Sequence, residues 1–207
     1  MIGTEFIDGQ GLGNQLFCYV TARAVAKERG FAFGTAGQEC FAVNIHSRRG
    51  MYFMDVDLGY NISTEDKKKF KIYREKETRL YIGNSRHDME HGCYIAGADE
   101  RIHQVEDQTL IYGNMQDESY FIKYLEDVKL WLKVKPEYDS YEYSRENLCI
   151  INMRGGEYVG SPELFIDRKY WLHGIKEMKK IRPDMEFMIF TDDVEAAARL
   201  LPGIQAH

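Results

Sequence analysis

The chain has 207 residues, of which 44% are hydrophobic and 29% charged, and its formal net charge is −6 at pH 7. This length suits one large domain or two small ones, and the composition is typical of a soluble globular protein. An acidic chain lacks the basic excess that nucleic-acid binding requires, and no apolar run approaches the roughly 18 residues of a membrane span. We therefore expect no nucleic-acid partner and no transmembrane segment, although peripheral membrane contact stays open.

The first notable motif is the glycine-rich stretch over residues 8–17, DGQGLGNQLF. Glycine lets a backbone turn sharply and lie close to a ligand, and a following helix directs N–H groups at an anion. The spacing does not match the dinucleotide fingerprint, because Asn14 stands where a third glycine is needed. Two interpretations stay open. Gly11, Gly13, Asn14 and Gln15 either bind phosphate or sugar hydroxyls, or they form a helix entry that Asn14 caps.

Strands and helices are predicted to alternate along the first 140 residues. Strands are expected over 4–7, 31–33 and 109–112, and a helix over 14–29 that ends at Gly30. A lysine-rich helix is expected over 64–77, with Ser63 or Thr64 as its cap. Apolar residues at helical spacing predict a further helix over 119–134, which Pro136 ends.

The remaining residues, 141–207, show a clearer pattern. A strand is predicted over 148–153, a helix over 168–181 and a second strand over 186–190. A helix over 192–201 follows, with Thr191 as its cap. This order of strand, helix, strand and helix predicts a parallel sheet with right-handed crossovers.

Two loops at the expected carboxyl ends of these strands carry polar groups, and ligands bind at that edge in such folds. In the first loop, Arg154 is a forked cation suited to a pyrophosphate, and Glu157 could fix it or act as a base. The alternative is a surface ion pair. In the second loop, Asp192 or Asp193 could accept hydrogen bonds from a guanine edge, or simply cap the following helix.

The N-terminal residues and the cysteines both favour a cytoplasmic location. Glu5 and Asp8 stand where a signal peptide would have basic residues and then an apolar core. No CxxC pair occurs among the cysteines, which we expect to be reduced thiols. They are Cys18, Cys40, Cys93 and Cys149.

Four segments together, in this order, resemble glycosyltransferase family 11, the α-1,2-fucosyltransferases. The glycine loop with its helix resembles the N-terminal signature of that family, and YGNMQDESYF at 112–121 resembles its mid-chain segment. Residues 150–159 resemble the His-x-Arg-Arg-Gly-Asp-Tyr motif, and Phe190-Thr191-Asp192-Asp193 resembles Phe-Ser-Asp-Asp.

The resemblance implies an α/β fold of GT-B type, with Rossmann-like parallel sheets flanked by helices. Residues 1–140 would form the first domain, with the glycine-rich loop, and residues 141–207 a partial domain that binds the GDP-sugar. The implied reaction transfers L-fucose from GDP-fucose to a galactose 2-hydroxyl of a glycan, with inversion. It needs neither a metal nor a further cofactor.

Residue roles carry over by position. The resemblance places Arg154 at the pyrophosphate, where it stabilises the leaving GDP. Asn152 falls where the family has histidine, Thr191 falls at the serine, and one of the two aspartates would read guanine. The general base is not identifiable; Glu157 and Asp8 are candidates by chemistry alone.

The chain also departs from the family pattern. The second motif arginine is Gly155 here, the first glycine of the loop is Gln10, and Glu157 replaces aspartate. The family continues past the position where this chain stops, so we expect a fragment or a shortened relative whose second domain is incomplete. A non-catalytic module that binds a glycan or nucleotide is therefore the alternative function.

Three further motifs have weaker functional interpretations. Residues 87–91 match the HxxEH letters of inverted zinc proteases, but their flanking glycines leave too short a helix for the two histidines. Residues 46–50 imitate the fucosyltransferase motif too early in the chain, and a basic surface loop is the expected structure. Asp55 and Asp57 imitate a metal-binding DxD, for which solvated aspartates at a strand end are the expected alternative.

Overall fold

The computed structural model describes residues 1–42, 53–76, 78–80, 93–95, 97–139, 141–159 and 165–207. The chain divides into two compact units, Met1–Asp139 and Ser140–His207. Both are α/β units in which helices pack on a parallel sheet, so the predicted fold class is confirmed. Within these ranges, none of the helices combines the length and the apolar character that crossing a membrane would require.

The first unit is built on a five-stranded sheet in which every pair is parallel. Its strand order is β4 (Tyr60–Asn61), β2 (Phe33–Ala36), β1 (Ile2–Glu5), β8 (Thr109–Tyr112) and β5 (Lys71–Arg74). The chain moves outward from β1 through β2 to β4 on one side, and β8 and β5 lie on the other. The direction in which successive strands are added to the sheet therefore reverses between β1 and β8. In folds of this type a ligand-binding crevice lies at that position.

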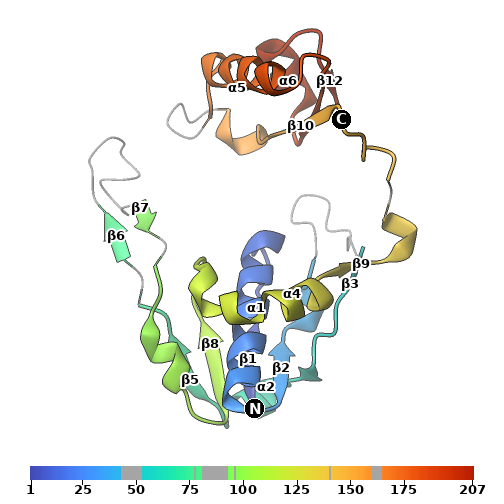
Figure 1. Ribbon diagram of the computed structural model, residues 1–207. Helices are drawn as coiled ribbons and strands as arrows, with labels where there is room; N and C mark the ends of the chain where they lie inside the picture. Colours follow the sequence, from blue (N-terminus) through green and yellow to red (C-terminus); the bar gives the residue numbers. More distant parts are fainter. Residues whose placement is uncertain (43–52, 77, 81–92, 96, 140, 160–164) are drawn as a thin grey trace. The chain divides into compact units, whose positions relative to one another are not determined.

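One long helix, α1 (Leu12–Arg29), packs along β1 and also contacts β2 and β8 (Figure 1). It is buried around most of its circumference because its residues contribute to two separate apolar clusters. Cys18, Ala22 and Val25 pack in the cluster that includes Ile2 and Ile111, whereas its other faces contact aromatic side chains. Gly30 ends the helix with a φ of 68°, a left-handed conformation that glycine adopts at low cost.

The other elements of the first unit are short. They are η1 (Gln38–Cys40), β3 (Met54–Asp55), α2 (Thr64–Lys67), β6 (Thr78–Leu80), β7 (Cys93–Ile95), η2 (Glu100–Gln104), η3 (Glu118–Tyr120), η4 (Ile122–Tyr124), α4 (Leu125–Trp131), β9 (Lys133–Val134) and η5 (Pro136–Tyr138). β3 pairs with β9 and β6 with β7, both antiparallel.

The predicted helix over 64–77 is wrong beyond its first turn. Ser63 caps α2 through the backbone N–H of Asp66, as one of the two predicted caps. The chain then enters β5, which pairs in parallel with β8 as the edge strand of the sheet. Lys71 and Arg74 of that strand are exposed, so the charges that suggested a solvated helix instead lie on a sheet edge.

The predicted helix over 119–134 is also wrong as a single element. Phe121 and Tyr124 have ψ values of 3° and 22°, outside the helical range, and they separate η3, η4 and α4. After Trp131 the chain becomes β9, which pairs with β3. Pro136 begins η5 rather than following a helix directly. Backbone pairing of β9 with β3 therefore prevails over the helical spacing of the apolar residues.

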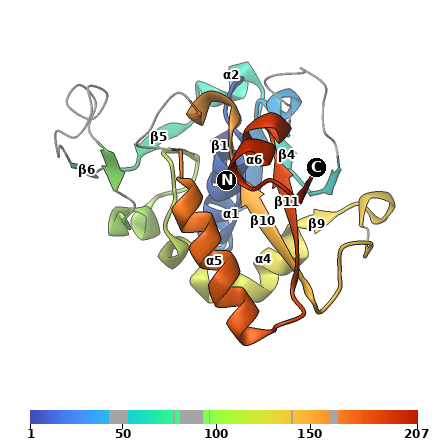
Figure 2. The same cartoon turned by 90° about the horizontal axis from the view of Figure 1, so that it is seen from above.

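The second unit matches its prediction closely. It contains β10 (Leu148–Met153), η6 (Gly156–Tyr158), α5 (Arg168–Ile181), β11 (Glu186–Thr191), α6 (Val194–Leu200) and β12 (Gln205–Ala206). β10 and β11 run side by side (Figure 2). β12 pairs with β11 on its other edge, and all three strands are parallel. Apolar residues of α5 and α6 share one cluster with Ile151 and Ile189, so both helices pack on the same face, as successive right-handed crossovers require.

Some element boundaries differ from the prediction by a few residues. The first two strands are β1 and β2 rather than 4–7 and 31–33, and α1 begins at Leu12 rather than residue 14. Cys18 is buried as a free thiol, while Cys40 and Cys149 are free but only partly buried. Burial raises the pKa of the Cys18 thiol to about 11, which keeps it protonated at neutral pH.

Candidate functional site

The two loops predicted to bind the ligand in the second unit lie together at one sheet edge. β10 and β11 pair in register from Leu148 with Glu186 to Met153 with Thr191. Arg154 and Asp192 therefore leave the sheet at the same level, at its carboxyl edge. This is the edge where parallel α/β sheets bind ligands.

Asp192 joins the two loops. Its Oδ1 accepts a hydrogen bond of 2.6 Å from the backbone N–H of Gly155, and its Oδ2 lies 3.9 Å from Nε of Arg154. A carboxylate that accepts from a backbone N–H of another loop fixes the spacing of both loops. Asp192 thus holds the first residues after β10, and it is not the residue that caps α6.

Arg154 presents its charge to solvent. Its side chain is 56% exposed, and its guanidinium carbon lies 4.8 Å from the centre of the Tyr158 ring. Stacking on the aromatic face restricts the rotation of the guanidinium without neutralising it. The pair with Asp192 is long and exposed, so it stabilises the fold little.

Asp193 is the cap of α6, so the alternative in which an aspartate caps this helix is confirmed and the predicted role of Thr191 as the cap is wrong. Oδ1 of Asp193 accepts from the backbone N–H of Ala196, while Oγ1 of Thr191 accepts from the N–H of Asp193 itself. Thr191 is the last residue of β11, so its hydroxyl shapes the turn before the helix. The helix begins at Val194 because Asp193 offers the first acceptor with capping geometry.

The glycines after Arg154 leave no room for larger residues. A Cβ at Gly155 would lie 2.5 Å from Cβ of Asp193, closer than real side chains approach. Gly156 has a φ of 48°, a conformation that side chains disfavour. The position of the second family arginine is therefore glycine in this chain for a packing reason, and not because φ is positive there.

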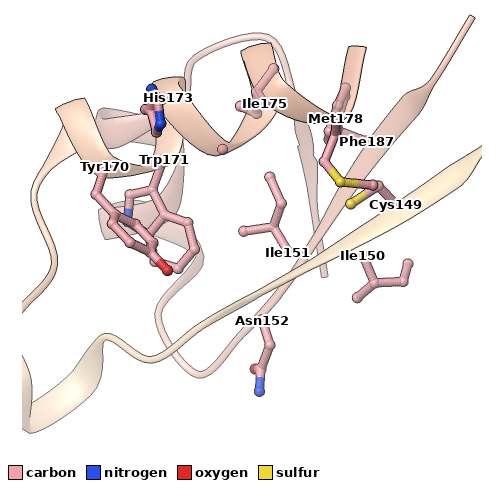
Figure 3. Close-up of a pocket in the computed structure, with 11 residues that line it drawn as sticks. Cys149, Ile150, Ile151, Asn152, Tyr170, Trp171, His173, Ile175, Met178 and Phe187 are labelled. Carbon is pink, nitrogen blue, oxygen red and sulfur yellow. The ribbon is translucent and has the colours of Figure 1, made fainter. Parts of the chain in front are cut away.

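The other two predicted residues of this unit are less informative. Asn152 is exposed on β10, and Figure 3 shows it on the side of the strand away from α5. Glu157 is a residue of η6, of which the structure describes the backbone but not the side chain. On the helix side, β10 and α5 enclose a mainly apolar cavity of about 330 Å³. Trp171, Ile175 and Phe187 line it, and it shares only Asn152 with the predicted site.

The glycine loop of the first unit is open at the start of α1. No described atom lies within 4 Å of a Cβ built at Gly11 or Gly13, so neither glycine is explained by packing against the described residues. Gly11 precedes the helix and Asn14 lies within its first turn, so the predicted cap at Asn14 is wrong. Oδ1 of Asn14 instead accepts a hydrogen bond of 2.8 Å from Nε2 of Gln116, a residue of the mid-chain segment.

Gln15 does not face the open loop. It is 1% exposed, its Nε2 donates to the carbonyl of Cys40, and its Oε1 accepts from the backbone N–H of Ala42, each over 2.9 Å. A buried amide with both ends satisfied holds the segment after η1 against α1. In this structure Gln15 supports the fold, although the sequence placed it among residues that bind the ligand.

A cavity of about 490 Å³ lies beside the glycine loop, at the carboxyl ends of β1, β5 and β8. Glu5 forms part of its wall and accepts from the Tyr112 hydroxyl over 2.6 Å and from Nζ of Lys67 over 2.5 Å. Burial opposes ionisation of Glu5, but these two hydrogen bonds outweigh it and lower the pKa of the carboxyl. The remaining lining residues are Thr4, Ile7, Asp8, Gly9, Gln10, Cys18, Arg74, Gly113 and Asn114.

Glu75 is the site-related residue that sequence reasoning missed. It is 8% exposed and follows β5 directly, and its Oε2 accepts from the backbone N–H groups of Asn114 and Met115 over 2.8 and 2.9 Å. Its Oε1 accepts from the Tyr120 hydroxyl over 2.8 Å. The only sequence signal for this role was that Glu75 is an acidic residue within a basic stretch, and that stretch was predicted to be a solvated helix.

Of the three alternative motifs, the structure describes the one that contains Asp55 and Asp57. Asp57 accepts from Nη2 of Arg23 over 3.2 Å and from the backbone N–H of Gly59 over 2.9 Å, so its oxygens have other partners. Residues 46–50 and 87–91 lie outside the described residues. Within the described ranges, no three His, Cys, Asp or Glu side chains are grouped as metal ligands.

Comparison with known proteins finds similar structures but no similar sequence. No family model matches the chain, and no curated protein matches it. Solved structures of the α-1,6-fucosyltransferase NodZ are similar in fold. One soaked with GDP-fucose has a TM-score of 0.48 and 13% identity, over 100% of this chain and 77% of that one. Another, from Bradyrhizobium, has a TM-score of 0.47 and 13% identity, over 99% and 78%. At these values the likeness carries no argument by itself, and function has to be argued from the residues of the sites.

Proposed function

We propose that the second unit binds the GDP part of GDP-fucose and that the chain is a fucosyltransferase. The observation that carries this proposal is the hydrogen bond from the Gly155 N–H to Asp192, which brings the arginine loop and the aspartate loop to one sheet edge. The two segments were singled out separately in the sequence, and a shared ligand explains why both carry polar side chains at that edge.

In this proposal Arg154 binds the diphosphate. A guanidinium can donate two parallel hydrogen bonds to phosphate oxygens, and stacking on Tyr158 already limits its orientation. Negative charge grows on the leaving GDP as the bond to the sugar breaks, so a cation held there stabilises the transition state more than the ground state. The same charge replaces one that a divalent ion supplies in other transferases.

One of the two aspartates would accept the guanine edge, as the family resemblance implies. Each already accepts one backbone hydrogen bond, Asp192 from Gly155 and Asp193 from Ala196. A carboxylate has about four lone-pair positions, so either can still accept from adjacent N–H groups of guanine. A uracil or adenine edge lacks that pair of neighbouring donors, which is the basis for the expected preference for GDP.

The finer parts of the proposal come from the resemblance. They are a galactose 2-hydroxyl as the acceptor group, inversion at the anomeric carbon and no requirement for a metal. Glu157 and Asp8 remain candidates for the base that takes the acceptor proton, on chemical grounds. The glycine loop, with the amide of Asn14 beside the cavity of the first unit, would contact a phosphate or a sugar hydroxyl.

Calorimetry of GDP binding to Arg154 variants tests the proposal. We expect Arg154→Ala to weaken binding about 10- to 100-fold, equivalent to about 1.4–2.8 kcal/mol, because half of the side chain is exposed and water moderates the loss. Arg154→Lys should restore binding only in part, since a point charge lacks the forked geometry. Arg145→Ala is the matched control, because Arg145 is also an exposed arginine paired with a carboxylate, that of Glu186. A folded Arg154→Ala variant that binds GDP like the parent would defeat the assignment.

A non-catalytic module that binds a glycan or nucleotide is the second candidate. The observation that favours it is the lack of space at Gly155, because the leaving group then has one cation fewer than the family pattern provides. The two functions separate in one assay, in which GDP release from GDP-fucose is measured with and without a galactose-terminated acceptor. Nucleotide binding without release that depends on the acceptor would select the module.

A further inference from the structure

We propose that Glu75 is a positioning residue: it fixes the turn over residues 113–116 and, through Gln116, sets the orientation of the Asn14 amide at the glycine loop. The positioning role for transfer rests on the proposed function, whereas the chain of contacts does not. Glu75, Gln116 and Asn14 come from three separate parts of the sequence, and hydrogen bonds join them within the first unit.

The first step of this chain is the buried carboxylate. Oε2 of Glu75 accepts from two successive backbone N–H groups, those of Asn114 and Met115, and Oε1 accepts from the Tyr120 hydroxyl. The Tyr120 oxygen in turn accepts from the N–H of Asp99 over 2.7 Å. A buried carboxylate with this many donors has a single favourable position, so the groups that it binds are held firmly.

The second step is the shape of the turn. Met115 is fully buried and has a φ of 53°, a left-handed conformation that a residue with a side chain rarely adopts. Such a conformation persists where the surroundings enforce it. Both N–H groups at this point bind Glu75, and a Cβ at Gly113 would lie 2.5 Å from Cβ of Glu75. The carboxylate and the turn are therefore built to fit each other.

The third step reaches the glycine loop. The turn delivers Gln116, whose Nε2 donates to Oδ1 of Asn14 over 2.8 Å. An amide whose oxygen accepts from a protein donor is oriented, and its NH₂ group is then the end presented away from that partner. Gly113 and Asn114 line the cavity beside this loop, so the same turn also shapes the cavity wall. Donors at this place suit phosphate or sugar oxygens.

Four variants test the proposal by nuclear magnetic resonance. Glu75→Gln keeps the shape but replaces one acceptor oxygen with a donor. Tyr120→Phe removes the hydroxyl, and with it both the hydrogen bond to Glu75 and the one from the Asp99 N–H. Gln116→Ala removes only the last link. Glu65→Gln is the charge control, since Glu65 is an exposed carboxylate paired with Lys68 on the surface.

Amide hydrogen exchange and the side-chain NH₂ resonances of Asn14 are the readouts. In Glu75→Gln, exchange at Asn114 and Met115 should speed up about tenfold or more, and the Asn14 resonances should move. In Gln116→Ala only the Asn14 resonances should move, and in Tyr120→Phe exchange should rise less than in Glu75→Gln. Parent-like exchange and unmoved Asn14 resonances in Glu75→Gln would overturn the proposal, and Gln116→Ala gives an independent answer should Glu75→Gln fail to fold.

Kinetics separates positioning from a purely structural role. With GDP-fucose and lactose as probes, Glu75→Gln and Gln116→Ala should lower kcat about tenfold or more, while the Kd for GDP stays within about twofold of the parent. Unchanged kcat in both folded variants would contradict the positioning role. A parent that binds no GDP would instead refute the proposed function, and the resonance measurements would still decide the contacts of Glu75.

Discussion

The two units hold their candidate sites in different ways. In the first unit the turn beside the cavity is held by Glu75, a carboxylate that is 8% exposed. In the second unit the loops are joined by Arg154 and Asp192, whose side chains are 56% and 47% exposed. Buried polar groups are costly unless fully bonded, so the first site is organised before any ligand arrives. The second keeps its charges in water, ready for a charged ligand.

The glycines of the two units also differ, but here the open environment is in the first unit and the packed one in the second. Gly11 and Gly13 of the first unit have open space, among the described residues, where a side chain would stand. Gly155 of the second unit is packed against Asp193 and cannot accept a side chain without movement. A glycine can therefore leave open space in one loop and allow close packing between two loops in the other, and sequence alone does not tell these cases apart.

The largest expected effect is the difference in unfolding free energy between removing a buried carboxylate and removing an exposed one. Glu75→Ala should lower the free energy of unfolding of the first unit by about 3–5 kcal/mol, because two backbone donors and a hydroxyl lose their acceptor. Asp192→Ala should cost the second unit about 1 kcal/mol or less. The chain's two tryptophans are Trp131 and Trp171, one in each unit. Fluorescence in Trp171→Phe and Trp131→Phe backgrounds thus reports each unit separately. Equal losses would contradict the contrast.

The glycines give the next largest effect. Gly155→Ala should destabilise the second unit by about 1–3 kcal/mol through overpacking against Asp193, and Gly155→Arg should weaken GDP binding rather than add a phosphate ligand. Gly13→Ala, in the first turn of α1, should be neutral or stabilise by up to about 1 kcal/mol. Urea unfolding with the same tryptophan backgrounds measures both. Tolerance of alanine at Gly155 would show that its contact with Asp193 relaxes freely.

A smaller effect is expected from pH. The Arg101 guanidinium beside Asp99 holds the pKa of that carboxyl well below its usual range. A lowered pKa stabilises the fold above the ordinary aspartate value of about 3.9, and this contribution disappears as the pH falls below it. The gap in unfolding free energy between the parent and Asp99→Asn should thus be widest near pH 6 and narrow below about pH 4. Parallel profiles would contradict this role.

Removal of divalent metal should have no effect. In the proposed function Arg154 supplies the positive charge near the diphosphate, so EDTA should leave the GDP affinity unchanged. Isothermal titration with and without EDTA measures this directly. Loss of binding with EDTA and its return with manganese would shift the assignment toward Asp55 and Asp57.

The second unit could be predicted from sequence because its elements depend on local signals. Asp167 caps α5, and β-branched and aromatic residues mark β11 as a strand. The candidate loops followed from the strand ends. The sequence left both Thr191 and the aspartates as possible caps of the following helix, and only the backbone geometry decides for Asp193.

The first unit was harder because pairing between distant segments overrides local preference. Lys71–Arg74 looks like part of a solvated helix, yet it pairs with β8, some forty residues later. The role of Glu75 was missed for the same reason, because this residue was predicted to lie in that helix. Its partners, Asn114 and Met115, lie on a turn that no local sequence pattern predicts. The burial of Gln15 could not be predicted from sequence either, because its side-chain partners, Cys40 and Ala42, lie 25 and 27 residues later in the chain.

Nucleotide selectivity tests the central claim most directly. The parent chain is titrated calorimetrically with GDP, UDP and ADP under identical conditions, with Arg154→Ala as the reference for diphosphate binding. Recognition of the guanine edge by Asp192 or Asp193 predicts that GDP binds at least about tenfold more tightly than UDP or ADP, since two hydrogen bonds to a carboxylate are lost otherwise. Equal affinity for the three nucleotides, or tighter binding of UDP, would contradict a GDP-sugar site in the second unit.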